Sequence, residues 1–171
     1  MNNIGKHILI FLGYLLLQTL FSRFVDFGPL IFIAIYPLYI ITLDTKTPLN
    51  SLFILAFAMG ILVDIFSGQI IGLNSAATLV MALFIPIVLK PAMAHKTESD
   101  NFRPGLNTLG FSKFIVCLLI LLAIHHVSYS LIESFSISFF IYNLPRMLVS
   151  YLVNILLITI IEYGINYTRR R

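Results

Sequence analysis

Charged side chains are scarce in this sequence. Asp, Glu, Lys and Arg together make up 11% of the 171 residues, whereas hydrophobic residues make up 59%. An ordinary soluble domain carries about 25% charged residues. The mean hydropathy of +0.98 and charge-free stretches along the whole chain indicate that lipid surrounds most of the protein. The composition therefore argues against a soluble fold and predicts a single integral membrane domain over residues 1–171.

Cysteine and tryptophan are almost absent as well. The single cysteine, Cys117, excludes an intramolecular disulfide and a cysteine-cluster metal site. Without tryptophan, an aromatic belt at the lipid headgroups has to come from the 8 Tyr and 15 Phe residues. Only His125 and His126 adjoin among the 4 histidines, and neighbouring side chains diverge on a helix, so buried hydrogen bonding is expected of them. We expect neither a metal site nor a bound cofactor.

The sequence does contain apolar stretches close to the roughly 20 residues that cross a membrane as a helix. We predict an all-α bundle of six transmembrane helices over residues 7–22, 27–43, 49–66, 71–89, 114–132 and 139–161, with a polar cytoplasmic loop at 90–113. Pro37 lies in the middle of the second stretch and is expected to kink it or to break it into two half-helices. A cleaved signal peptide is the competing interpretation of the first stretch, but Phe21-Ser22-Arg23 provides no small-residue cleavage site.

Lysine and arginine are unevenly distributed over the predicted connections. With six spans, all but two of the 11 basic residues fall on the side of the two termini, the exceptions being Arg23 and Arg146. Basic residues are retained on the cytoplasmic side of a membrane, so both termini are predicted to be cytoplasmic. The net charge of +4 then reflects this topology and contact with anionic inner-leaflet lipid, and no nucleic-acid partner is expected.

Asp64 is the acidic residue that lies within a predicted span. A carboxylate at the centre of a membrane helix costs about 2.5–3.5 kcal/mol, and less near a helix end, where this one lies. Two functional interpretations are open, a proton- or ligand-binding group and a polar anchor for a partner helix. The structural alternative is a carboxylate at the outer interface that is hydrated or paired with Arg146 or Arg23.

The residues around Asp64 predict a close-packed helical hairpin. Gly60 precedes Asp64 by one helical turn, so a notch and a polar group share one face of the third helix. Small residues also line one side of the fourth helix, and small faces allow two membrane helices to approach closely. These residues are Gly72, Ser75 and Ala76.

Few other ionisable residues lie near the spans. Arg146 is a cation inside the sixth predicted span, and we expect an ion pair with Asp64 or with Glu133. Glu162 is expected at the inner interface among lipid headgroups. A lone carboxylate supports metal-assisted phosphoryl transfer poorly, and no glycine-rich phosphate loop or HExxH motif is present. The sequence therefore does not predict an enzyme.

One motif carries a family resemblance. Residues 60–76 read GILVDIFSGQIIGLNSA, which resembles the MreD family of bacterial rod-shape-determining membrane proteins. The family pattern places glycine, aspartate and glycine ahead of a Gly-Leu pair and a small residue, and it maps onto Gly60, Asp64, Gly68, Gly72, Leu73 and Ala76. Asn74-Ser75-Ala76 departs from it, because the family often has the small residue one position earlier.

The resemblance implies a non-enzymatic scaffold of the cell-elongation machinery in the bacterial inner membrane, which helps to organise peptidoglycan synthesis and cell shape. Its implied partner is MreC, a bitopic membrane protein, and through MreC the cytoskeletal MreB, the glycosyltransferase RodA and a penicillin-binding transpeptidase. The expected mechanism is docking of a partner helix in a groove near the outer leaflet. The candidate packing residues are Gly60, Asp64, Gly68, Gly72, Asn74 and Ala76.

A second function stays open, because the MreD fold also resembles the substrate-binding S component of energy-coupling-factor transporters. In that alternative the chain is a small-molecule (vitamin) binding subunit with a polar cavity that opens outward. The polar side chains available for such a cavity are Asp64, Asn74, His125, His126 and Arg146.

Overall fold

The computed structural model describes residues 3–24, 31–93 and 101–169. Within these ranges all regular secondary structure is helical. The helices are α1 (Asn3–Phe24), α2 (Pro37–Ile41), α3 (Leu49–Ser67), α4 (Leu73–Ala92), α5 (Leu106–Leu109), α6 (Phe111–Ser134) and α7 (Ile137–Arg169). Five of them, α1, α3, α4, α6 and α7, are long and apolar enough to cross a membrane. The predicted all-helical fold is confirmed for the described residues, with five helices of spanning length where six spans were predicted.

The second predicted span is not a long helix. Residues 31–35 have no regular secondary structure, Tyr36 is a turn residue, and only Pro37–Ile41 form a helix. Pro37 occupies the first helical turn, where its missing N–H leaves no hydrogen bond unmade. The chain therefore breaks at Pro37 and is extended before it, whereas residues 27–30 lie outside the described ranges.

The predicted loop at 90–113 is partly helical in its described residues. Helix α4 runs on to Ala92, and α5 forms one turn before α6 begins at Phe111. The described part of the loop contacts the turn after α2, where the Thr45 N–H donates to the Phe102 carbonyl at 3.0 Å. The last helix, α7, has 33 residues and continues well beyond its predicted end at 161.

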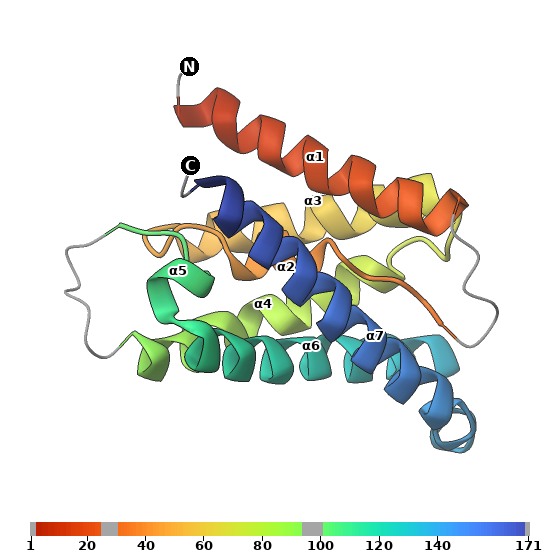
Figure 1. Cartoon of the computed structure of the whole chain (residues 1–171). Coiled ribbons are helices and arrows are strands. Elements are labelled where there is room, and N and C mark those ends of the chain that lie inside the picture. The colour runs from red at the N-terminus through yellow and green to blue at the C-terminus, as the bar shows by residue number, and fades with distance from the viewer. Residues whose placement is uncertain (1–2, 25–30, 94–100, 170–171) are drawn as a thin grey trace.

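The long helices are arranged as a row with the extended segment inside it. Helix α4 packs against α3 and α6, while α1 packs against α3 and α7 packs against α6, so α1 and α7 are the two ends of the row. Figure 1 shows that the start of α1, the end of α7, the turn 42–48 and residues 101–105 lie at one end of the bundle, which we call the termini end. Residues 31–41 run back towards this end through the middle of the bundle, where residues 33–41 are buried.

Candidate functional site: an aspartate-capped hairpin and a buried polar network

The α3–α4 hairpin is packed backbone against backbone at Gly60. A Cβ atom placed on Gly60 would lie 2.5 Å from the Cα of Ser75 and 2.6 Å from its nitrogen, so only glycine allows this approach. Gly72 and Ala76, the other small residues expected in the contact, are partly exposed. Gly72 adopts φ +95 in the turn instead, and the exposed Gly68 adopts φ +69 at the end of α3, conformations that favour glycine.

Asp64 caps the start of α4. Its carboxylate accepts hydrogen bonds from the Gly72 N–H at 2.8 Å, the Asn74 N–H at 3.2 Å and the Asn74 Nδ2 at 2.7 Å. The side chain is fully buried. A negative charge is stabilised at a helix N-terminus, where unpaired amides and the helix dipole face it. The carboxylate thus ties the end of α3 to the beginning of α4.

The expected ion pair of Asp64 with Arg146 or Arg23 is not formed within the described residues. Arg146 instead contacts Glu133, with Nη1 at 3.1 Å from Oε1, and this pair is partly exposed. Arg23 donates through Nε to the Phe66 carbonyl at 2.9 Å. The backbone amides at the start of α4 stabilise the Asp64 carboxylate in place of a cation. A search for oppositely charged residues in the sequence does not predict this contact.

From Asn74 a chain of hydrogen bonds leads into the centre of the bundle. The Asn74 amide nitrogen faces Asp64 and Gln69, which leaves its Oδ1 to accept from the Tyr36 hydroxyl at 3.0 Å. The same hydroxyl also lies 2.9 Å from the Thr78 Oγ1 and 2.7 Å from the His125 Nε2. Since its one proton serves Asn74 or Thr78, the contact with His125 is satisfied when the histidine Nε2 carries a hydrogen and donates. Four of the side chains that these hydrogen bonds link are each at most 3% exposed: Asp64, Asn74, Tyr36 and His125.

A second buried cluster surrounds His126. Its Nδ1 lies 2.9 Å from the Leu122 carbonyl, so this nitrogen donates and the Nε2 accepts from the Asn154 amide at 3.0 Å. Asn154 also donates to the Phe32 carbonyl at 2.9 Å and accepts from the Ala34 N–H at 2.8 Å. The adjacent histidines are thereby assigned opposite neutral tautomers, each set by its hydrogen-bond partners.

Buried polar side chains also stabilise the extended residues 31–35 inside the apolar bundle by hydrogen-bonding to their backbone. Gln18 of α1 accepts from the Ile35 N–H at 2.7 Å and donates to the Ile33 carbonyl at 2.7 Å. On the opposite side, Ser150 and Asn154 of α7 hold the segment at Phe32 and Ala34. Non-helical backbone at membrane depth is tolerated only where protein groups satisfy its N–H and C=O. Side chains from both end helices of the row therefore replace the missing helical hydrogen bonds.

Several of these residues were not singled out from the sequence. Gln18 and Asn154 are neutral amides in apolar helices, and a polar residue inside a span is itself a signal of a buried partner. Glu162 was expected among headgroups, but it is fully buried and binds Arg103 through two contacts of 2.6 Å. Its depth follows from the long reach of α7 and from the fold of residues 101–105 over it.

Comparison with protein-family models, curated proteins and solved structures finds no match to this chain. The resemblance to the MreD family therefore rests on the motif at residues 60–76 and on the order of apolar segments. In the structure this motif builds a capped, tightly packed hairpin, with Gly60, Asp64 and Asn74 in the contact. The arrangement is suited to holding helices in a defined position.

Proposed function

We propose that this protein is a non-enzymatic scaffold of the bacterial cell-elongation machinery, similar to MreD, that binds an MreC-like bitopic partner in the inner membrane. Through that partner it would connect with MreB, RodA and a penicillin-binding transpeptidase in peptidoglycan synthesis. The chain would cross the membrane six times, with residues 31–41 as the second pass and both termini cytoplasmic. The positive charges near the termini end favour this orientation.

One observation carries the proposal: the polar side chains of the spans bind one another and the backbone. Asp64, Asn74, His125 and His126 are each at most 3% exposed and hydrogen-bonded within the bundle. They fix the shape of the protein, and large apolar side chains cover its outside. A rigid body with a shaped apolar surface is what helix docking in lipid requires.

The same observation disfavours the S-component alternative. A vitamin-binding subunit needs polar side chains that face a cavity. Of the residues available for one, Asp64, Asn74, His125 and His126 are engaged within the bundle, and Arg146 pairs with Glu133.

The tip of the α3–α4 hairpin is the surface we assign to the partner. It exposes four large apolar side chains at 48–68%: Ile65, Phe66, Ile70 and Ile71. The tip lies at the end opposite the termini end (Figure 1), which is the outer side in the proposed orientation. The partner's single transmembrane helix would contact the bundle there, near the outer leaflet, and the cap at Asp64 would hold the tip in shape.

Photocrosslinking tests this assignment. A photoreactive residue at Ile70 is expected to capture a co-expressed MreC-like partner, whereas the same residue at Ile87 is not. The two positions are matched, because each is 65% exposed on an apolar surface, but Ile87 lies near the termini end. Equal capture at both positions, or none at Ile70, would contradict the docking surface.

A substitution at Asp64 tests whether the cap is needed for partner binding at the tip. Asp64→Leu removes the cap and is expected to reduce partner recovery while the protein still inserts into the membrane. Native mass spectrometry of the gently purified wild-type protein gives the independent control. A stoichiometric bitopic partner supports the scaffold, whereas a vitamin-sized adduct or ATPase subunits would favour the transporter.

A further inference from the structure

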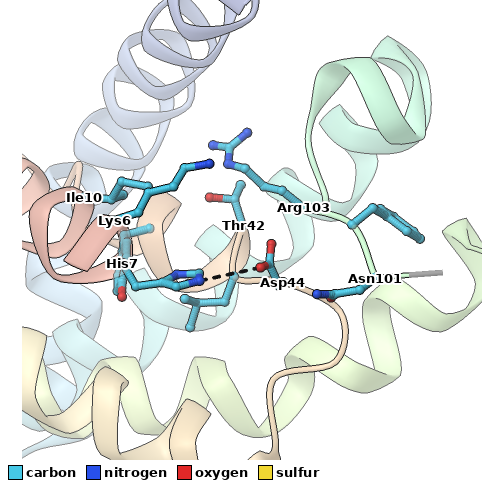
Figure 2. Close-up of a pocket in the computed structure, with 10 residues that line it drawn as sticks. Lys6, His7, Ile10, Thr42, Asp44, Asn101 and Arg103 are labelled. Carbon is cyan, nitrogen blue, oxygen red and sulfur yellow. Dashed lines mark ion pairs between the residues drawn. The ribbon is translucent and has the colours of Figure 1, made fainter. Parts of the chain in front are cut away.

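A polar pocket of about 380 Å³ opens at the termini end of the bundle. The side chains that give it its character come from three separate parts of the chain (Figure 2): Lys6, His7, Thr42, Asp44, Asn101 and Arg103. The start of α1 supplies the first two, and the residues after α2 and before α5 supply the others. The proposed scaffold function does not use this pocket.

The pocket has a cationic part and an acidic part. Lys6 and Arg103 both reach into it (Figure 2). Arg103 is already paired with the buried Glu162 through two contacts of 2.6 Å, whereas the three ion pairs of the described residues do not include Lys6. Burial alone lowers the pKa of Arg103, but hydrogen bonds and the charge of Glu162 outweigh it and raise the pKa, so the guanidinium stays protonated. Asp44 lies across the pocket with an oxygen 3.8 Å from His7 Nε2.

An apolar groove of about 370 Å³ continues from this pocket between α1 and α7. The two cavities share Ile10 and Arg103. The remaining lining comes from both helices: Gly13, Tyr14, Leu17, Ile161 and Ile165. Since α1 and α7 are the two ends of the helix row, the groove lies where the row is left open.

Gly13 lines the groove without a side chain. A Cβ atom placed on Gly13 would meet no atom within 4 Å, so the space beside it is not taken by another part of the protein. The groove therefore has room beside Gly13 for a molecule other than this chain.

We propose that these joined cavities hold one molecule of phosphatidylethanolamine, with an acyl chain in the groove and the headgroup in the pocket. The phosphate would lie at Lys6, beside the Glu162-paired Arg103, and the primary ammonium would lie at Asp44. A free phosphate ion would leave the apolar groove and Asp44 without a role. A lipid with an uncharged or anionic headgroup would bring no cation of its own to Asp44, which would then have only the partly exposed His7 beside it.

Lipid titration followed by native mass spectrometry tests the proposal. Delipidated protein is titrated with phosphatidylethanolamine, with phosphatidylglycerol and with inorganic phosphate. We expect one retained phosphatidylethanolamine per chain, weaker binding of phosphatidylglycerol, and no displacement of the lipid by phosphate. Equal retention of both lipids, or displacement by millimolar phosphate, would overturn the proposal.

Variants test each part of the site against a matched control. Gly13→Leu fills the groove without a clash and should abolish lipid retention, whereas Gly5→Leu, on the same helix and outside both cavities, should not. Lys6→Gln should weaken binding of both lipids about fivefold. The exposed Lys46, at the same end and outside the cavities, serves as its control in Lys46→Gln.

The acidic part has its own test. Asp44→Asn should remove the preference for phosphatidylethanolamine over phosphatidylglycerol while leaving retention of a lipid intact. Unchanged lipid retention in Gly13→Leu would show that the groove is not the acyl-chain site. An unchanged preference in Asp44→Asn would show that the ammonium is not bound there. None of these readouts depends on an MreC-like partner, so the lipid site and the scaffold role can fail separately.

Discussion

Replacement of Gln18 by leucine tests whether side chains hold the extended segment inside the bundle. Gln18 is 1% exposed and contacts the Ile33 carbonyl and the Ile35 N–H, both at 2.7 Å. Leucine fits the same helix equally well, because the two residues have similar helix propensities. Gln18→Leu therefore removes these two short hydrogen bonds, which leaves the Ile33 carbonyl and the Ile35 N–H without partners. It also removes a longer contact from the Tyr36 N–H at 3.3 Å and a hydrogen bond to the Ser22 hydroxyl.

The expected loss of stability follows from these two groups. A buried polar group left unpaired costs about 1–3 kcal/mol, which gives about 2–6 kcal/mol for the pair. Side-chain hydrogen bonds in one membrane protein average only about 0.6 kcal/mol, because partners are also found in the unfolded state. The lower end is therefore the better expectation, about 2 kcal/mol, which corresponds to about 30-fold in an opening equilibrium.

Hydrogen–deuterium exchange and thiol labelling separate local from global effects. Peptides that cover residues 31–36 should exchange about 30-fold faster in Gln18→Leu, and labelling of the single buried thiol, Cys117, reports unfolding of the bundle. The adjacent Thr19→Val is the control, because the Thr19 hydroxyl bonds only to the Leu15 carbonyl of its own helix. If exchange in both variants matches the wild type, the segment does not depend on Gln18 and the reasoning is wrong.

Two further substitutions probe close contacts elsewhere. Gly60→Ala should lower the free energy of unfolding of the detergent-solubilised protein by about 1–3 kcal/mol through overpacking. Gly164→Ala is the control and should not lower it, because a Cβ atom placed on Gly164 would meet no atom within 4 Å. Equal melting temperatures of the two variants would refute the tight hairpin. Glu162→Gln breaks the buried pair with Arg103 and should cost about 3 kcal/mol. Glu133→Gln is its control, because the Arg146–Glu133 pair is partly exposed, and its expected loss is below about 1 kcal/mol. An equal loss of stability in the two variants would show that burial of the ion pair is unimportant.

The positions of five long helices could be predicted from the sequence, but the second predicted span, over residues 27–43, is not a long helix in its described residues. Apolar stretches of spanning length mark α1, α3, α4, α6 and α7, because lipid imposes the same requirement on each helix separately. Asp64 and Gly60 could also be singled out, since a carboxylate and a glycine one turn apart are unusual in a span. Their contacts with Asn74 and Ser75 lie only 10 and 15 residues away along the chain.

The tertiary structure decided what happens to residues 31–43 and which partners the buried polar groups take. Hydrophobicity alone predicted a spanning helix there, but only the short α2 forms, because Gln18 and Asn154 satisfy the backbone of the extended residues before it. Ala34 and Asn154 are 120 residues apart, and Arg103 and Glu162 are 59 apart. Local sequence does not indicate such pairs, because each forms only when α7 packs against a part of the chain that is distant in sequence. The sequence by itself thus determined where the chain is apolar enough to span a membrane, whereas packing between distant helices determined how the spans are joined.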